Sequence, residues 1–193
     1  MTTDQSNFEK MKRIAELENE LSILKNSLPK EKTVNVPASF EPIFEKAQET
    51  VEEYFSKLKR DPSKGIFEIN NERYVLIRAS ALSEEFFDNI KDLYKDKSEK
   101  EAFSIASSFL FDVGHLIGKQ DAMCFHKKMN LKDPVEKLAA GPVHFAHSGW
   151  AFVDILPESN PEPNLNFYMK YNHPYSFEAD SWIKSGKKSN EAV

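Results

Sequence analysis

The feature that most constrains this fold is a run of about thirty residues without proline, residues 98–129. It opens with Ser98 followed three positions later by Glu101, the arrangement of a capping box at a helix N-terminus. Gly114 and Gly118 lie four residues apart within it. Because glycine costs an exposed helix about 1 kcal/mol relative to alanine, two glycines on one face predict close backbone packing there. The segment therefore predicts one long helix that packs closely along its glycine face.

Shorter elements precede this helix. An apolar stripe at helical spacing predicts a helix across residues 38–60. Residues 66–77 have the pattern of two short strands around Asn70 and Asn71, and asparagine tolerates the left-handed conformation of a tight hairpin turn. A further helix is expected from Ser83.

Helix and strand also alternate after the long helix. A short helix is expected to begin at Asp133 and to end at the Gly-Pro pair 141–142. Strands are expected at 146–155 and 165–172, on either side of a loop too rich in proline to continue them, and a final helix at 176–184. The order of helix, hairpin, helices, hairpin and helix predicts an α+β fold, in which an antiparallel sheet from two hairpins packs against helices.

The N-terminal segment, residues 8–28, has the apolar spacing of a coiled coil. Its apolar residues alternate at spacings of three and four, with Glu and Lys beside them: Ile14, Leu17, Leu21, Leu24 and Leu28. About two heptads favour a helix that pairs with a second copy in a homodimer, and the alternative is an amphipathic helix folded back on its own domain. Residues 29–37, with two prolines and no periodicity, predict a linker. The expected domains are a dimerisation helix at 1–31, a linker and amphipathic helix at 32–64, and a C-terminal domain at 65–193.

Composition argues against several function classes. A formal net charge of −5 argues against a nucleic-acid-binding surface, which needs clustered Lys and Arg. The single cysteine, Cys124, excludes an internal disulfide framework and a multi-cysteine zinc site within these residues. No apolar run approaches the roughly 20 residues that span a bilayer, and the N-terminus lacks the apolar middle of a signal peptide. We expect a cytoplasmic, bacterial protein without nucleic-acid or membrane partners.

Two histidines stand three residues apart, just after the Gly-Pro pair. If a strand begins there, side chains at i and i+2 share a face, so Phe145 and His147 point the same way and His144 points oppositely. Tyr171 and His173 share a face of the partner strand for the same reason. Histidines three apart on a strand are poor joint metal ligands, so no metal is expected. The pattern is consistent with a ligand pocket and also with histidines that only pack in the core. The candidate ligand-binding residues are Leu138, Phe145, His147, Tyr171 and His173.

Four segments in order resemble a known family. They are GIFEINNERYVLIRASAL at 65–82, GHLIGKQDA at 114–122, GPVHFAHSGW at 141–150 and FYMKYNHPYSFEAD at 167–180. The stretch from Gly65 onward, about 129 residues, is similar to the N-terminal sensor domain of the XylR type. This domain is found in activators of aromatic catabolism that depend on the sigma-54 form of RNA polymerase.

The resemblance implies a function and a ligand site. Such domains bind a small aromatic or other hydrophobic effector between sheet and helices, dimerise, and control a downstream ATPase or other output module. The family normally continues into a 4-vinyl-reductase-like half with a cysteine-rich zinc site, whereas this sequence ends at Val193. A downstream output domain is expected if the chain is a fragment. In phenol-responsive relatives, a histidine after Gly-Pro and a tryptophan on the next strand hold the ligand hydroxyl, and the matching positions here are Phe145 and His173.

The sequence favours a ligand sensor over two other function classes. One alternative is a structural adaptor that dimerises through its helices and holds no ligand. The other is a small enzyme that uses His173 with Glu178 or Asp180, although helix-dipole stabilisation explains those two acids equally well. The sequence contains no nucleophile elbow, phosphate loop or dinucleotide fingerprint, so we expect neither catalysis nor a cofactor. An apolar cavity at the candidate residues would favour the sensor, and a filled interior the adaptor.

Overall fold

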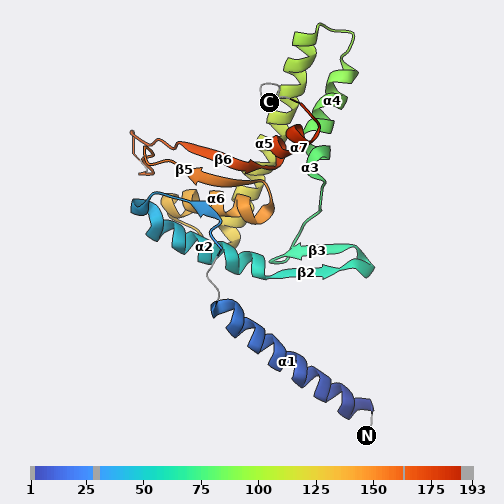
Figure 1. Cartoon of the computed structure of the whole chain (residues 1–193), viewed down its shortest axis with the longest axis vertical. Coiled ribbons are helices and arrows are strands. Elements are labelled where there is room, and N and C mark those ends of the chain that lie inside the picture. The colour runs from blue at the N-terminus through green and yellow to red at the C-terminus, as the bar shows by residue number, and fades with distance from the viewer. Residues whose placement is uncertain (1–2, 28–30, 163, 188–193) are drawn as a thin grey trace. The chain divides into compact units, whose positions relative to one another are not determined.

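The computed structural model describes residues 3–27, 31–162 and 164–187 (Figure 1). The chain divides into two compact units, residues 1–32 and 33–193. In the first unit, helix α1 (Thr3–Ser27) exposes the predicted coiled-coil seam: Ile14, Leu17, Leu21 and Leu24 are each at least 47% exposed. Leu28, the last seam position, lies outside the described residues.

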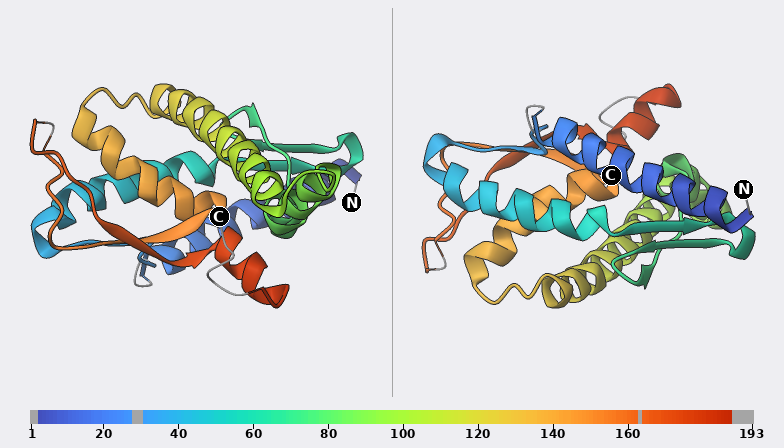
Figure 2. Two further views of the ribbon diagram at one scale, coloured as in Figure 1. Left: turned by 90° about the horizontal axis from the view of Figure 1, so that it is seen from above. Right: turned by 90° about the horizontal axis from the view of Figure 1, so that it is seen from below.

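The core of the second unit lies between two helices and a small sheet. The helices are α2 (Glu41–Ser56) and α6 (Pro134–Ser148), and the strands, in sheet order, are β1 (Val34–Asn35), β5 (Ala151–Ile155) and β6 (Tyr171–Ser176). β5 pairs antiparallel with β6 and parallel with β1. The segment predicted as a linker therefore contributes a strand, in which Val34 is buried against Val153. Figure 2 shows α2 and α6 side by side, with the sheet on one side of them and α5 on the other.

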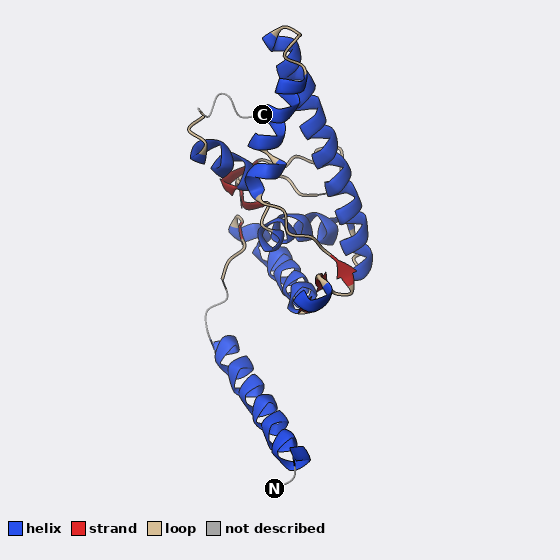
Figure 3. Cartoon of the chain, turned by 90° about the vertical axis from the view of Figure 1, so that its right-hand side faces the viewer, coloured by secondary structure: helices blue, strands red, loops and turns tan. Residues whose placement is uncertain are grey.

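A second sheet and four more helices complete the described part of this unit. The strands are β2 (Leu58–Asp61), β3 (Ile66–Ile69) and β4 (Glu72–Arg73), all antiparallel, and 3₁₀ turns occupy Ala38–Phe40 and Pro62–Lys64. The helices are α3 (Ala79–Leu82), α4 (Glu84–Leu93), α5 (Glu99–Lys128) and α7 (Phe177–Lys184). The hairpin turn at Asn70 and Asn71 is confirmed, with φ values of 50° and 65°. Helices predominate over the two small sheets (Figure 3), and the predicted α+β class is confirmed. The two predicted hairpins lie in separate sheets.

Helix α5 spans both apolar clusters of the second unit. Its capping box is confirmed, because the backbone N–H of Ser98 donates to the Glu101 carboxylate at 3.1 Å and the Glu101 N–H donates to the serine hydroxyl at 3.3 Å. Near its start, Ala106 packs with Phe87 of α4 and Trp182 of α7. Near its end, Phe125 enters the larger core formed by α2, α6 and the sheet.

The prediction that the Gly-Pro pair 141–142 ends a helix is wrong, because both residues lie inside α6. Proline disfavours a helical residue before it through a clash with that residue's Cβ and N–H, and Gly141 has no Cβ. The proline removes only one backbone donor. Burial of Ala140 and Val143, both 0% exposed, stabilises the continued helix. α6 then ends at Gly149, whose φ of 80° is the left-handed conformation that glycine adopts readily.

Two further predictions are corrected. The strands expected at 146–155 and 165–172 both begin later, as β5 and β6, and residues 146–148 belong to α6 instead. The close backbone packing expected at Gly114 and Gly118 is also wrong: a Cβ added at either glycine would have no heavy atom within 4 Å outside its own helix segment. Both glycines border a cavity instead.

Candidate functional site

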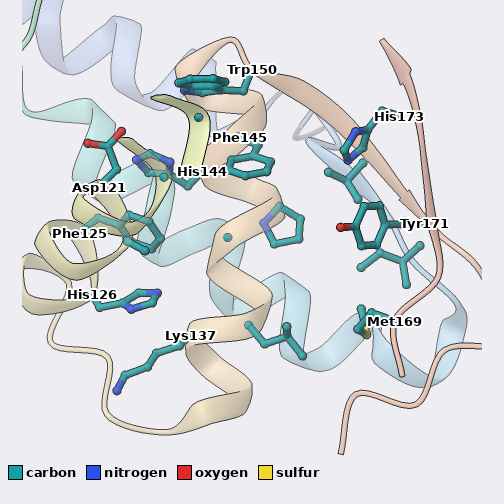
Figure 4. Close-up of a pocket in the computed structure, with 18 of the residues that line it drawn as sticks. Asp121, Phe125, His126, Lys137, His144, Phe145, Trp150, Met169, Tyr171 and His173 are labelled. Atoms are coloured by element: carbon teal, nitrogen blue, oxygen red, sulfur yellow. The ribbon is translucent and has the colours of Figure 1, made fainter. Parts of the chain in front are cut away.

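A cavity of about 620 Å³ lies between α5, α6 and the β5–β6 hairpin. Figure 4 shows α6 as the middle wall, with lining side chains from α5 on one side of it and from β6 on the other. Most of its lining is apolar or aromatic: Phe125, Leu138, Pro142, Phe145, Trp150, Val153, Ile155, Phe167, Met169 and Tyr171. A volume of this size and lining is typical of small-molecule sites.

Three glycines leave this space unfilled. Gly114 and Gly118 border the cavity from α5, and Gly141 borders it from α6. None of the three would bring an added Cβ within 4 Å of a neighbouring atom, apart from its own chain neighbours and nearby helix backbone. Because the interior of a protein is normally close-packed, side chains missing on both helices leave a void between them. Gly114 and Gly118, which predicted tight packing, instead leave space for the cavity together with Gly141.

Four of the five predicted ligand-binding residues line the cavity: Leu138, Phe145, Tyr171 and His173. Tyr171 and His173 share a face of β6, as predicted, and their rings stack with centroids 5.1 Å apart. His147 is absent from the lining and stacks instead on Phe55 of α2, at a centroid distance of 5.0 Å. Its buried Nε2 has no hydrogen-bond partner in the described part of the chain.

His144 lines the cavity in place of His147. The prediction that these two histidines point to opposite faces is wrong, because residues three apart on a helix share a face. Both therefore contact the same ring, that of Phe55. His144 lies on the cavity side of this pair, where its ring stacks on Phe125 with centroids 4.3 Å apart.

The environment of His144 keeps its imidazole neutral. The residue is only 3% exposed, and burial, with smaller contributions from His147 and His126, lowers its pKa to about 4. No side chain or backbone group in the described ranges hydrogen-bonds its ring nitrogens. Burial also lowers the pKa of His173 on the opposite wall. Neutral imidazole offers one donor and one acceptor, so both walls can bind a hydroxyl or carbonyl group.

Trp150 is a cavity residue that the sequence reasoning missed. It follows Gly149 in a Schellman motif, in which the Trp150 N–H donates to the Phe145 carbonyl at 2.9 Å. The indole consequently lines the main cavity and also a neighbouring one of about 350 Å³. Phe145 and His173 line both cavities too, so these three rings form the boundary between them. The Ser-Gly-Trp sequence after a helix is the signal that could have identified this position.

The described residues contain no group of three or more His, Cys, Asp or Glu side chains that could hold a metal ion. Cys124 is a half-buried free thiol whose pKa is raised, mainly by burial. Glu178 shares the second cavity with His173, and burial raises its pKa. Asp180 borders a different hollow, and neither acid hydrogen-bonds His173 within the described ranges.

Comparisons with known proteins give no family for this chain. No protein-family model matches it, and no curated protein matches it. Among the helices of the described residues, none has the length and apolar character needed to cross a bilayer. The cavity and its side chains are therefore the observations from which a function can be argued.

Proposed function

We propose that residues 33–193 form a sensor domain that binds a small aromatic or other hydrophobic effector between α5, α6 and the β5–β6 hairpin. The observation that carries this proposal is the apolar cavity of about 620 Å³, which glycines on two helices leave unfilled. The resemblance of residues 65–193 to the XylR-type sensor domain supports the same function. The protein acts, in this proposal, as part of a bacterial transcriptional or signalling regulator rather than as an enzyme.

The cavity lining offers the effector two kinds of contact, apolar and hydrogen-bonding. Aromatic and aliphatic side chains remove the effector's apolar surface from water, at about 25 cal/mol per Å². His144 on one wall and His173 on the other supply hydrogen bonds to a polar group of the effector. One such bond lost inside an apolar pocket costs about 1 to 3 kcal/mol, which corresponds to roughly tenfold or more in affinity.

Occupancy of the cavity can reach the rest of the domain through two elements. α5 borders the cavity and also packs at its other end with Phe87 and Trp182. β6 carries Tyr171 and His173 and leads directly into α7, which contains Trp182. An effector that orders the cavity wall therefore affects the α4–α5–α7 cluster through α5 and through β6 with α7. A downstream output domain would take its signal from that cluster.

The test of this proposal is a thermal-shift screen with aromatic and hydrophobic compounds, followed by a variant that fills the cavity. A ligand at 100 times its Kd raises native-state stability by about 2.7 kcal/mol, so hits raise the Tm. Gly118→Leu places a side chain in the void and should abolish the shift. Gln120→Leu adds a leucine to an exposed position of the same helix and should keep it. A shift that persists in Gly118→Leu, or a screen without hits, would contradict the proposal.

A pair of histidine variants tests where the effector lies. His144→Phe should weaken binding of any hit about tenfold or more, because the effector loses a hydrogen bond. His147→Phe should leave affinity unchanged, because that ring packs on Phe55 outside the cavity lining. Equal losses from both variants would place the effector elsewhere.

We also propose that α1 pairs with α1 of a second copy, in parallel. Its seam residues are exposed, which favours pairing with a second copy. Such pairing fits a dimeric sensor and also the alternative, a dimerisation adaptor without a ligand. Leu17→Lys with Leu21→Lys should shift the protein toward monomer in analytical ultracentrifugation. Ala15→Lys with Ile23→Lys adds the same two charges outside the seam and should leave the dimer intact. A dimer that survives the seam variant would assign the interface to the second unit.

A further inference from the structure

Asp121 lines the main cavity and also a separate hollow of about 420 Å³ that Tyr74 and Cys124 border. It lies on α5, is half-buried, and forms neither a hydrogen bond nor an ion pair with any described residue. Burial alone raises its pKa. Glu72, a nearby acid on β4, differs in having a partner, because its carboxylate pairs with Lys128 at 2.7 Å. A half-buried acid without such a partner is partly removed from water without compensation, as Glu178 is in the neighbouring second cavity.

None of the groups around the cavity supplies the missing positive charge. His126, His144 and His173 all have their pKa lowered by burial, which favours the neutral imidazole. Lys137 is the one lysine of the described lining, but Figure 4 shows it at the opposite end of the site from Asp121, with His126 between them. Its charge acts on His126, whose pKa it lowers.

On the other side of Asp121, the nearest titratable groups are neutral or already paired. Tyr74 hydrogen-bonds Tyr54 with their hydroxyls 2.9 Å apart, and its pKa is raised by burial first, with a smaller contribution from Asp121. The pKa of Cys124 is raised for the same two reasons, among others. A phenol and a thiol of this kind carry no charge at neutral pH, so they do not balance the carboxylate.

The aromatic lining of the cavity suits a cation as well. Phe125, Phe145, Trp150, Phe167 and Tyr171 surround the space. The faces of aromatic rings attract a positive charge, also where the rings are partly exposed, as Phe145, Phe167 and Tyr171 are at 39% or more. The lining therefore accommodates the apolar body of a ligand without disfavouring an ammonium group.

We propose that the effector is a hydrophobic amine, whose protonated nitrogen pairs with Asp121 while its apolar body fills the space beside the three glycines. This inference rests on the proposed sensor function and narrows its ligand class. The ammonium supplies the positive charge that the cavity wall lacks, and a charge-assisted hydrogen bond to the carboxylate fixes its orientation. A neutral ligand of the same shape leaves the carboxylate without a partner and binds more weakly.

The experiment compares two probes of the same shape, 1-naphthalenemethylamine, which is cationic at pH 7, and 1-naphthalenemethanol, which is neutral. Isothermal titration calorimetry on the full chain should find the amine bound at least about tenfold more tightly. Asp121→Asn keeps the side-chain shape and should abolish this preference, while affinity for the alcohol is retained. Glu178→Gln removes a half-buried carboxylate from the neighbouring second cavity and should leave the preference unchanged.

The outcomes separate this inference from the function on which it rests. If the parent binds the alcohol as tightly as the amine, or if Asp121→Asn keeps the preference, the amine assignment is overturned and the hydrophobic pocket stands. If the parent binds neither probe, the pocket itself is overturned. Should Asp121→Asn fail to fold, Asp121→Glu restores the charge and should retain the preference. In the parent, added salt should weaken binding of the amine and leave that of the alcohol unchanged, because screening acts only on the charged pair.

Discussion

The two sides of helix α6 differ in packing: one side is filled and the other borders a cavity. Toward α2, Ala139, Ala140 and Val143 are at most 1% exposed and pack into the main core with Phe44 and Val51. Away from α2, the same helix presents Gly141, Pro142 and Phe145 to the cavity, and Figure 4 shows Phe145 on the same side of α6 as Tyr171 and His173. Small side chains leave no void only where the facing element comes close enough, or supplies side chains large enough, to fill the space. α5 faces α6 with glycines of its own, so a void remains between them.

The two histidines of α6 follow the same division. His147 stacks on Phe55 and its Nε2 is enclosed by the packed side of the helix. His144, one turn earlier, contacts the same ring but also borders the cavity. Residue type and spacing are therefore insufficient to separate a packing histidine from one that can reach a ligand. The neighbouring helix makes that distinction.

The largest expected effect is a difference in unfolding free energy between variants on the packed side of α6 and variants at the cavity wall. Phe44→Ala removes a ring that is 4% exposed from the packed side and should cost about 3 to 5 kcal/mol of unfolding free energy. Leu138→Ala, at the half-buried cavity wall, should cost about 1 kcal/mol, because much of its surface faces an open space. Urea denaturation of both variants measures the difference. Equal losses would mean that the cavity is closed in solution.

An intermediate effect is the pH dependence contributed by His144. Its folded pKa of about 4 is lower than the 6.5 of an exposed histidine, so the unfolded chain binds the additional proton. This contribution to stability is fully present above pH 6.5 and is lost as the pH falls toward 4. Between pH 7.5 and pH 5 the loss from His144 alone should be about 2 kcal/mol.

Urea titrations at a series of pH values test this dependence. His147, His126 and His173 also have lowered pKa values and add to the loss in the same direction. His144→Gln should remove the largest share of the pH dependence of the unfolding free energy, whatever its effect on overall stability. An unchanged pH dependence would show that His144 is accessible to water in the folded protein.

The smallest expected effect is a gain in stability at a cavity glycine. Gly118→Ala adds a methyl group to a helical position with open space around it, and should stabilise the protein by about 0.5 to 1 kcal/mol. Gly149→Ala is the control, because its φ of 80° disfavours any residue with a Cβ and should make that variant less stable. A lower Tm for Gly118→Ala would indicate that the glycine face of α5 is closely packed, as the sequence predicted.

Local signals explain what the sequence alone determined. The capping box at Ser98 and the Asn70-Asn71 turn were predicted correctly, because a few adjacent residues satisfy the backbone groups or adopt the conformations concerned. The apolar stripe of α2 was also predictable, since helical spacing puts Phe44, Ala47 and Val51 on one face. From these elements the α+β class followed.

Tertiary structure alone decided the continuity of α6 and the shape of the cavity. Burial of α6 against α2 outweighs the one backbone hydrogen bond that Pro142 removes, and this reverses the predicted phase of His144 and His147. Whether Gly114 and Gly118 touch a neighbour or border a void depends on what the facing helix presents, which no local pattern encodes. Which group pairs with Asp121 is a question of the same kind, because no lysine of its own helix forms an ion pair with it in the described ranges. Local sequence determines the conformation of a segment, whereas packing between distant segments determines which side chains meet and where space is left.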